Sequence, residues 1–206
     1  MQANSSDVVI LRNLHVRGDG TTNGSGAVGI ALNSGALLSI EGCTISGAGA
    51  IGINAVPAGN VGSTLNVINT TITDVGNGIG FGPTAGAAVF GEADHVTIQR
   101  ARGISSNGII ANGNVVFTVT NSSVLNAQGI GINAQPGAVV NVDSSSVSSN
   151  NTAFAAIGGI IRVSRSAIYD NNANFSISGG GQIATDGANV GAINGATMPN
   201  GTVSRF

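Results

Sequence analysis

The chain has 206 residues, enough for one domain with a substantial core, yet only 8% of its residues are charged and 3% are aromatic. The formal net charge is −2, and all seven basic residues are arginine. We therefore expect neither nucleic-acid binding nor membrane insertion, because the first needs a basic surface and the second needs about 18 consecutive apolar residues. With so few charges, solubility has to come from Asn, Ser and Thr.

From the N-terminus onward the chain repeats an eight-residue block that aligns without internal gaps. The first, third, sixth and eighth positions are apolar or small, and the others are mostly polar. Two short strands joined by a bend give this pattern, because successive residues of a strand face opposite sides. The blocks occupy residues 9–16, 38–45, 65–72, 89–96, 117–124, 140–147, 161–168 and 183–190.

A third alternating strand follows each of the first seven blocks. Its inward-facing pairs are expected to be Val28/Ile30, Ile51/Ile53, Ile79/Phe81, Ile109/Ala111, Ile130/Ile132, Phe154/Ala156 and Phe175/Ile177. The line Ile-Gly-Ile-Asn-Ala occurs at positions 51–55 and again at positions 130–134. The same interval separates the second block from the fifth, so the two lines should occupy equivalent places in coils three repeats apart.

The fifth block position predicts a sharp bend between the two strands. It holds Asn13, Gly42, Asn69, Ala93, Asn121, Ser144, Arg165 and Gly187. Asn and Gly tolerate the left-handed backbone that such a bend needs.

These repeats predict an all-β fold, because no apolar pattern is sustained at the helical period. We expect a single-stranded right-handed parallel β-helix, a solenoid of about eight coils with three short strands in each. The coils should cover residues 7–190, and residues 191–206 should form an irregular C-terminal cap or tail of the same domain, 1–206. The first coil begins at once, so an exposed N-terminal rung is expected to promote self-association.

The tandem segments LSIEGCTISGAGAIGINA and FTVTNSSVLNAQGIGINA carry a resemblance to a known family. They resemble the right-handed parallel β-helix of the pectin-lyase-like superfamily, and are similar to uncharacterised secreted bacterial β-helix proteins. The resemblance implies a secreted, periplasmic or cell-surface location, with an export signal and further N-terminal coils outside this chain. It leaves activity open, because that superfamily contains lyases, hydrolases, tail spikes and adhesins.

The fourth coil is the one candidate for chemistry. It concentrates Glu92, Asp94, His95, Arg100 and Arg102, and an insertion lengthens the segment between its block end at position 96 and the next strand at position 109. His95 beside two carboxylates could transfer a proton, and the arginines could bind a carboxylated sugar. The alternative is a solvated loop with local ion pairs, in which Asp94 lies at an inward bend held by hydroxyl groups of neighbouring coils.

Two functions therefore remain. The first is a non-catalytic extracellular or cell-surface structural or interaction module whose partner is a polysaccharide or another protein, with no cofactor. The second is a polysaccharide-active lyase or glycoside hydrolase, or a carbohydrate-binding β-helix, for an acidic polysaccharide. The resemblance implies calcium only for the enzyme. Scattered carboxylates and the absence of lysine favour the first.

Overall fold

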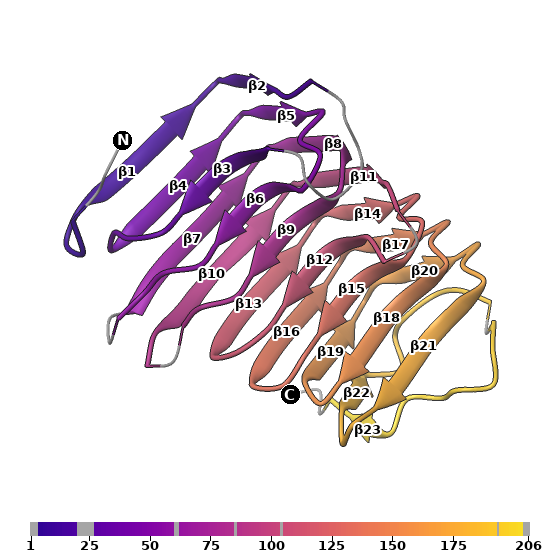
Figure 1. Ribbon diagram of the computed structural model, residues 1–206. Helices are drawn as coiled ribbons and strands as arrows, with labels where there is room; N and C mark the ends of the chain where they lie inside the picture. Colours follow the sequence, from indigo (N-terminus) through magenta and orange to yellow (C-terminus); the bar gives the residue numbers. More distant parts are fainter. Residues whose placement is uncertain are drawn as a thin grey trace.

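The computed structural model describes residues 4–19, 27–59, 62–84, 86–103, 105–192 and 194–203. Within these residues the chain is all-β and winds as a parallel β-solenoid, with one strand of each coil in each of three sheets (Figure 1). Every pairing between neighbouring strands is parallel, so each strand aligns with its counterpart in the next coil. The all-β solenoid with three strands per coil, predicted from the repeats, is confirmed.

The three sheets are named A, B and C in the order in which the chain enters them. Sheet A contains β1 (Val8–Arg12), β4 (Leu37–Glu41), β7 (Gly62–Ile68), β10 (Ala88–Asp94), β13 (Val115–Thr120), β16 (Ala138–Asp143), β19 (Ile160–Ser164), β22 (Gln182–Thr185) and β23 (Gly201–Thr202). Sheet B contains β2 (His15–Arg17), β5 (Thr44–Ser46), β8 (Thr71–Val75), β11 (Thr97–Ala101), β14 (Ser123–Leu125), β17 (Ser146–Ser148) and β20 (Ala167–Tyr169). Sheet C contains β3 (Val28–Leu32), β6 (Ile51–Ala55), β9 (Asn77–Phe81), β12 (Asn107–Ala111), β15 (Ile130–Ala134), β18 (Thr152–Ile157) and β21 (Ala173–Ser178).

The described strands make seven complete coils, and β22 starts an eighth. The expected count of about eight coils is therefore slightly too high. The eighth block fails at its end, because Val190 forms an isolated bridge with Ala167 and is 73% exposed. Its side chain does not join the inner column that the block ends were expected to form.

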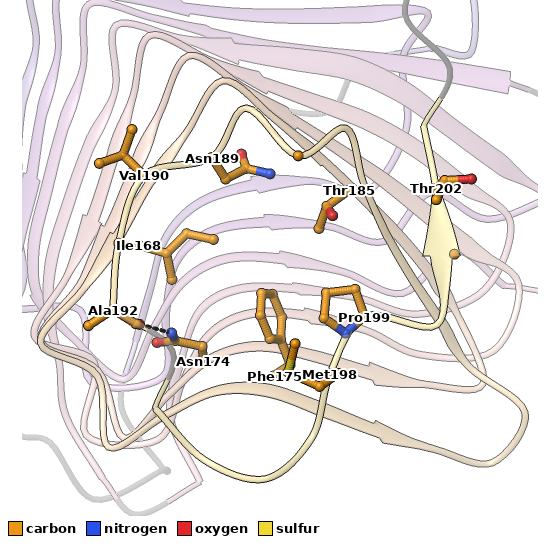
Figure 2. Close-up of a pocket in the computed structure, with 13 residues that line it drawn as sticks. Ile168, Asn174, Phe175, Thr185, Asn189, Val190, Ala192, Met198, Pro199 and Thr202 are labelled. Carbon is orange, nitrogen blue, oxygen red and sulfur yellow. Dashed lines mark hydrogen bonds between the residues drawn. The ribbon is translucent and has the colours of Figure 1, made fainter.

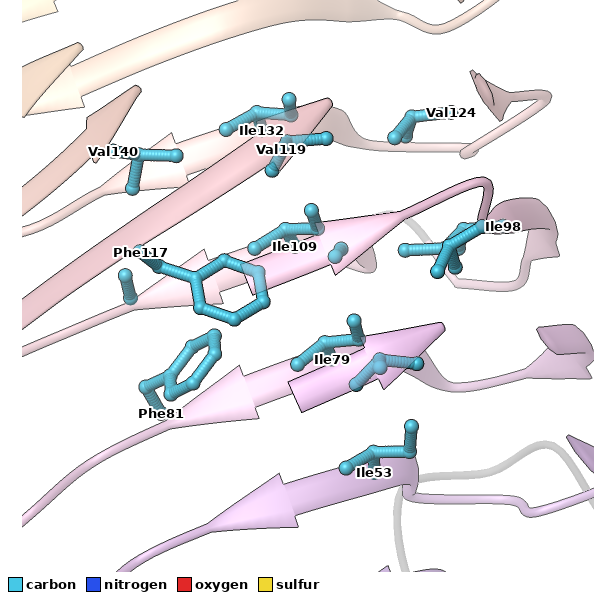
Figure 3. Packing of buried hydrophobic residues seen from close by; sticks show 14 of the residues in the cluster. Ile53, Ile79, Phe81, Ile98, Ile109, Phe117, Val119, Val124, Ile132 and Val140 are labelled. Carbon is cyan, nitrogen blue, oxygen red and sulfur yellow. The ribbon is translucent and has the colours of Figure 1, made fainter. Parts of the chain in front are cut away.

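Apolar side chains of equivalent positions stack along the inside of the solenoid. Ile53, Ile79, Ile109 and Ile132 follow one another along sheet C, and all four are fully buried (Figure 3). Burial of such columns drives the fold, because a single coil cannot cover its own apolar face.

The bends between sheets A and B have the left-handed backbone that the sequence predicts. Positive φ angles occur in every coil at the same place, at Asn13, Gly42, Asn69, His95, Asn121, Ser144, Arg165 and Gly187. Seven of these eight were expected. In the fourth coil His95, with φ of 54°, takes the place predicted for Ala93.

The fourth block was aligned two positions too early. Gly91 pairs with Leu65 and Ala93 pairs with Val67, so the block covers residues 91–98 and ends at Ile98. Asp94 therefore lies on the outer face of sheet A, and the expected inward bend position for Asp94 is wrong. Val96 takes that position instead, and its backbone N–H donates to the hydroxyl of Ser122 at 3.0 Å.

Sheet C shows the same two-position shift in three coils. The inward pairs are Ile30/Leu32, Ile53/Ala55 and Ile132/Ala134 rather than the pairs expected for the first, second and fifth coils. Ile51 and Ile130 are half-buried on the outer side, and Val28 is exposed.

A column of glycines lets sheet C approach sheet B closely. A Cβ at Gly108 would lie 2.3 Å from Cγ1 of Val124 and 2.6 Å from the carbonyl oxygen of Gly131, so a side chain does not fit there. The strand pairings place glycine at this position in five coils, namely Gly29, Gly52, Gly78, Gly108 and Gly131. This contact explains the glycine at the second position of the repeated Ile-Gly-Ile-Asn-Ala line.

The two ends of the solenoid differ. At the N-terminal end, β1, β2 and β3 each pair on one side only within the described residues, and Val8, Ile10 and Leu14 are exposed. At the other end, residues 194–203 cross the last coil and add β23 to sheet A. We call this segment the C-terminal strap.

Candidate functional site

The five candidate residues of the fourth coil fall into two groups on different sides of sheet B. Glu92 and Asp94 belong to β10 in sheet A, and His95 follows them at the bend between sheets A and B. Arg100 lies near the end of β11 and Arg102 follows it, at the bend between sheets B and C. The coil therefore does not bring the expected acid and base residues together with the arginines.

Asp94 is held by three neighbouring side chains. Its Oδ1 accepts hydrogen bonds from Thr120 Oγ1 at 3.0 Å and Asn121 Nδ2 at 2.9 Å, and its Oδ2 lies 2.9 Å from Nδ1 of His95. The hydrogen bond from Asn121, followed by the contact with His95, lowers the pKa of Asp94. A carboxyl group stabilised as the anion is unsuited to act as a general acid near neutral pH.

Glu92 shares the outer face of sheet A with Asp94, two strand positions away. This spacing puts the two Cα atoms about 6.8 Å apart, which is compatible with the carboxyl separation in glycosidases. Glu92 is exposed, and its strand neighbours in the adjacent coils are Asn66 and Thr118. The Cα spacing of the pair is therefore compatible with a glycosidase, but Asp94 is stabilised as the anion and is unsuited to the role of general acid.

Asp74 was missed by the sequence analysis and is the centre of the second group. Its Oδ1 accepts from Arg100 Nε at 2.9 Å, its Oδ2 accepts from Arg100 Nη2 at 2.6 Å, and Arg102 also pairs with Oδ1. Arg100 Nη2 additionally donates to Thr73 Oγ1 at 2.7 Å. The hydrogen bonds from Arg100 are the main reason that the pKa of Asp74 lies far below its usual range.

Backbone geometry explains how Asp74 and Arg100 meet. Asp74 lies two positions after Ile72, where the third block ends, and Arg100 lies two positions after Ile98, where the fourth block ends. Both residues have a φ of 56°. Equivalent positions in adjacent coils are about 4.8 Å apart, so an aspartate and an arginine there stack directly. The correct alignment of the fourth block would have predicted this contact.

A surface pocket of about 410 Å³ adjoins the two arginines. Its lining residues are Arg100, Arg102, Asn126, Ala127, Gln128 and Ser149. Gln128 Oε1 accepts from the backbone N–H of Gly103 at 2.7 Å, which leaves its Nε2 group, like Nδ2 of Asn126, as a donor without a partner in the described residues. Two arginines share one aspartate here, so the group keeps one positive charge. We call this the arginine pocket.

Two further outward carboxylates are also paired. Glu41 accepts from Arg12 Nε at 2.6 Å, and Asp143 accepts from Ser164 Oγ at 2.6 Å and pairs with Arg165. Across the described ranges, no three His, Cys, Asp or Glu side chains are grouped so that they could hold a metal ion. The calcium site that the enzyme alternative implies is therefore not formed by these residues.

Cys43 is buried inside the solenoid. Its Sγ lies 3.4 Å from the backbone nitrogen of Leu14, within a column that holds Thr70 in the next coil. It therefore fills a structural position in the stack. The part of the chain that the structure describes contains no helix long and apolar enough to cross a membrane.

Comparison with known protein families, with curated proteins and with solved structures finds no significant match to this chain.

Proposed function

We propose that the chain is a non-catalytic interaction module that works outside the cytoplasm, at a cell surface or after secretion, and binds an acidic polysaccharide. The observation that carries this proposal is the arginine pocket, in which Arg100 and Arg102 share the single carboxylate of Asp74. The weakly charged surface and the resemblance of the repeats to pectin-lyase-like β-helices support the location.

The pocket has the chemistry that a uronate residue requires. The Nε and Nη2 groups of Arg100 already donate to Asp74 and Thr73, so a uronate carboxylate would be bound by Nη1 of Arg100 together with the guanidinium of Arg102. The side chains of Arg100 and Arg102 are 47% and 45% exposed. Amide and hydroxyl groups of Asn126, Gln128 and Ser149 lie beside them and suit the hydroxyl groups of a sugar.

Catalysis is disfavoured by the charge pairing of the fourth coil. Asp74 is occupied by two arginines, and Asp94 by Thr120, Asn121 and His95. Both carboxyl groups have lowered pKa values, so both are anionic near neutral pH. A glycosidase instead needs one of its two carboxyl groups to be protonated, because that group donates a proton to the leaving sugar. The enzyme alternative rests on the spacing of Glu92 and Asp94 alone.

Affinity electrophoresis on polygalacturonate and alginate, with dextran as the neutral polysaccharide, tests the proposal. We expect retardation by the uronates only, and a loss of about tenfold or more in affinity for Arg100→Ala/Arg102→Ala. Arg162→Ala is the matched control, because Arg162 is exposed on sheet A and its guanidinium donates to Asn141 at 3.3 Å, away from the pocket. Equal retardation of both variants would refute the arginine pocket as the binding site.

Product assays with and without calcium separate binding from turnover. The proposal predicts neither new reducing ends nor unsaturated products from any of these polysaccharides. Turnover that disappears in Glu92→Gln, while binding and the far-ultraviolet circular dichroism spectrum are retained, would establish the enzyme alternative instead.

A further inference from the structure

The outer face of sheet A carries a column of apolar side chains that is partly exposed. Phe90 of β10 aligns with Val116 of β13, and the column continues through Val139 of β16 to Ile160 of β19 (Figure 1). Phe90 is 48% exposed and Val116 is 37% exposed, whereas Val139 and Ile160 are half-buried. Adjoining apolar side chains on an exposed face, with polar residues beside them, are typical of an interaction surface.

Two charged side chains without an ion pair lie beside this apolar column. Glu92 lies on β10 and Arg162 on β19, each two positions after the apolar residue of its strand. Both are exposed, and among the described residues the guanidinium of Arg162 donates only to Asn141, at 3.3 Å. An ion-pair partner holds each of the other charged side chains on the described strands of sheet A, namely Arg12, Glu41, Asp94 and Asp143. The face therefore presents one unpaired charge of each sign.

Glu92 and Arg162 stand in one column, three strands apart. The strand pairings align Glu92 with Thr118, Thr118 with Asn141, and Asn141 with Arg162. A strand spacing of about 4.8 Å puts the Cα atoms of the two charged residues about 14 Å apart. Their midpoint lies between β13 and β16, which is also the midpoint of the apolar column. A half-turn about an axis through this midpoint, parallel to the strands, exchanges the places of the two charges.

We propose that the outer face of sheet A binds a second copy of this chain, related by that two-fold axis, so that the two solenoids lie antiparallel. Glu92 then faces Arg162 of the second copy, and Arg162 faces its Glu92, so a single contact forms two ion pairs. A two-fold axis along the charged column would instead place each charge opposite its own copy. Like charges would disfavour that arrangement.

The same axis brings the two apolar columns together. Phe90 faces Ile160 of the second copy, and Val116 faces Val139, so each exposed side chain is covered by a half-buried one. Packed sheets keep their strand directions within about 30° of each other, and an axis parallel to the strands meets this condition.

The overlap has the size of a small specific interface. An axis between β13 and β16 brings the six strands from β7 to β22 of one copy over those of the other. Strands about 4.8 Å apart and about six residues long give a face of roughly 29 Å by 20 Å. Both copies together bury about 1,150 Å², near the lower end for specific interfaces, so we expect a reversible dimer.

This face is separate from the other surfaces of interest. Beyond β22 the C-terminal strap continues sheet A with β23, and the open pocket lined by Phe175, Met198 and Pro199 lies at the end of the solenoid (Figure 2). The arginine pocket lies at the bend between sheets B and C, and Ile10 on β1 lies outside the overlap. The dimer is therefore independent of polysaccharide binding and of association through the N-terminal edge.

Charge exchange tests the proposal, because it can abolish and restore the contact without changing the core. All proteins carry Ile10→Lys to remove association through the N-terminal edge, and sedimentation equilibrium measures dimerisation. Glu92→Arg and Arg162→Glu should each weaken the dimer about tenfold or more, since each places like charges opposite one another twice. An equimolar mixture of these two variants should dimerise again, because one copy then carries two positive charges and the other two negative charges at the facing positions.

Arg17→Glu is the matched control, since Arg17 is exposed on β2 of sheet B and undergoes the same change of charge. Circular dichroism confirms that each variant is folded. The proposal is overturned if the Ile10→Lys protein is monomeric, if Arg17→Glu weakens the dimer as much as Arg162→Glu does, or if neither the mixture nor Glu92→Arg/Arg162→Glu restores it. NMR shifts of Phe90 caused by a polysaccharide, in a protein that stays monomeric, would assign the face to that ligand and also overturn the proposal.

Discussion

Replacing Ile132 and Ile130 separately by alanine tests the register of sheet C with one residue type in one strand. Ile132 is 0% exposed and packs in the inner column between Ile109 and Phe154 of the adjacent coils. Ile130 lies two positions earlier on the outer side and is half-buried. Both substitutions remove the same atoms, so they differ only in where those atoms lie.

The two substitutions should lower the free energy of unfolding by clearly different amounts. A fully buried isoleucine changed to alanine loses about 2 to 5 kcal/mol, because a cavity remains where the side chain was. The half-buried Ile130 should lose about 1 kcal/mol, since roughly half as much apolar surface leaves the protein interior. Phe154 and Ile109 are themselves fully buried and packed in the same column, so we expect little relaxation into the space that Ile132→Ala creates and a cost in the upper part of this range.

Urea unfolding followed by circular dichroism gives the free energy of unfolding of each variant, and hydrogen exchange shows which coils open. Ile132→Ala should lose protection first in its own coil and in the two adjacent coils, because coils contact mainly their neighbours. Equal destabilisation by the two variants, or a larger effect of Ile130→Ala, would refute the register.

We expect four further outcomes, which concern low pH, a side chain added at a crowded glycine, a charge placed in the core and the open N-terminal end of the solenoid. The contribution of Asp74 to the free energy of unfolding should be constant above the ordinary aspartate pKa, and it should fall as the pH drops from there towards the lower folded-state pKa of Asp74. Urea titrations from pH 7 to pH 2 should show a weaker acid dependence for Asp74→Asn than for the unchanged protein. Gly108→Ala should lower the melting temperature strongly, because the new Cβ would meet the backbone carbonyl oxygen of Gly131 at 2.6 Å; an unchanged melting temperature would contradict the close approach. Ile132→Asp should destabilise the fold by several kcal/mol, since its carboxylate would be buried without a partner, whereas Arg102→Ala should cost about 0 to 1 kcal/mol because it loses only a surface pair; the reverse order of melting temperatures would show that the inner wall is assigned wrongly. Light scattering should show association that rises with concentration and is reduced by Ile10→Lys at the open N-terminal edge, so a monomer at all concentrations would count against this prediction.

The coil architecture was predictable because burial alone imposes it. Alternating apolar residues that recur at short and similar intervals along the whole chain have no other way to be covered, so the strand content and the bends at Asn69 and Asn121 followed from the sequence. The exact register was harder to predict, because a slip of two positions keeps every side chain on the same face of its strand. Apolar alternation cannot detect that slip.

Two local signals could have corrected the register. In the fourth coil the bend needs positive φ, which His95 adopts more readily than Ala93. In sheet C the glycine column, which includes Gly52 and Gly131, fixes the alignment of each coil because a side chain does not fit there. Both signals depend on backbone geometry rather than on hydrophobicity.

The candidate site was only partly predictable for the same reason. The arginines were singled out by their concentration in one coil, but their partner Asp74 lies in the preceding coil and looked isolated in the sequence. The open pocket between the last coil and the C-terminal strap could not be predicted, because its shape depends on how the strap crosses that coil.

A ¹³C NMR titration of the side-chain carboxyl groups distinguishes structural pairs from a catalytic set among Asp94 and the charged residues around Asp74. Hydrogen bonds from Arg100 to Asp74, and from Asn121 and His95 to Asp94, stabilise both anions. We expect both groups to remain ionised below the usual aspartate pKa of about 3.9. A pKa near 6 or above for Asp94 or Asp74 would mark a poised general acid, and would contradict the account.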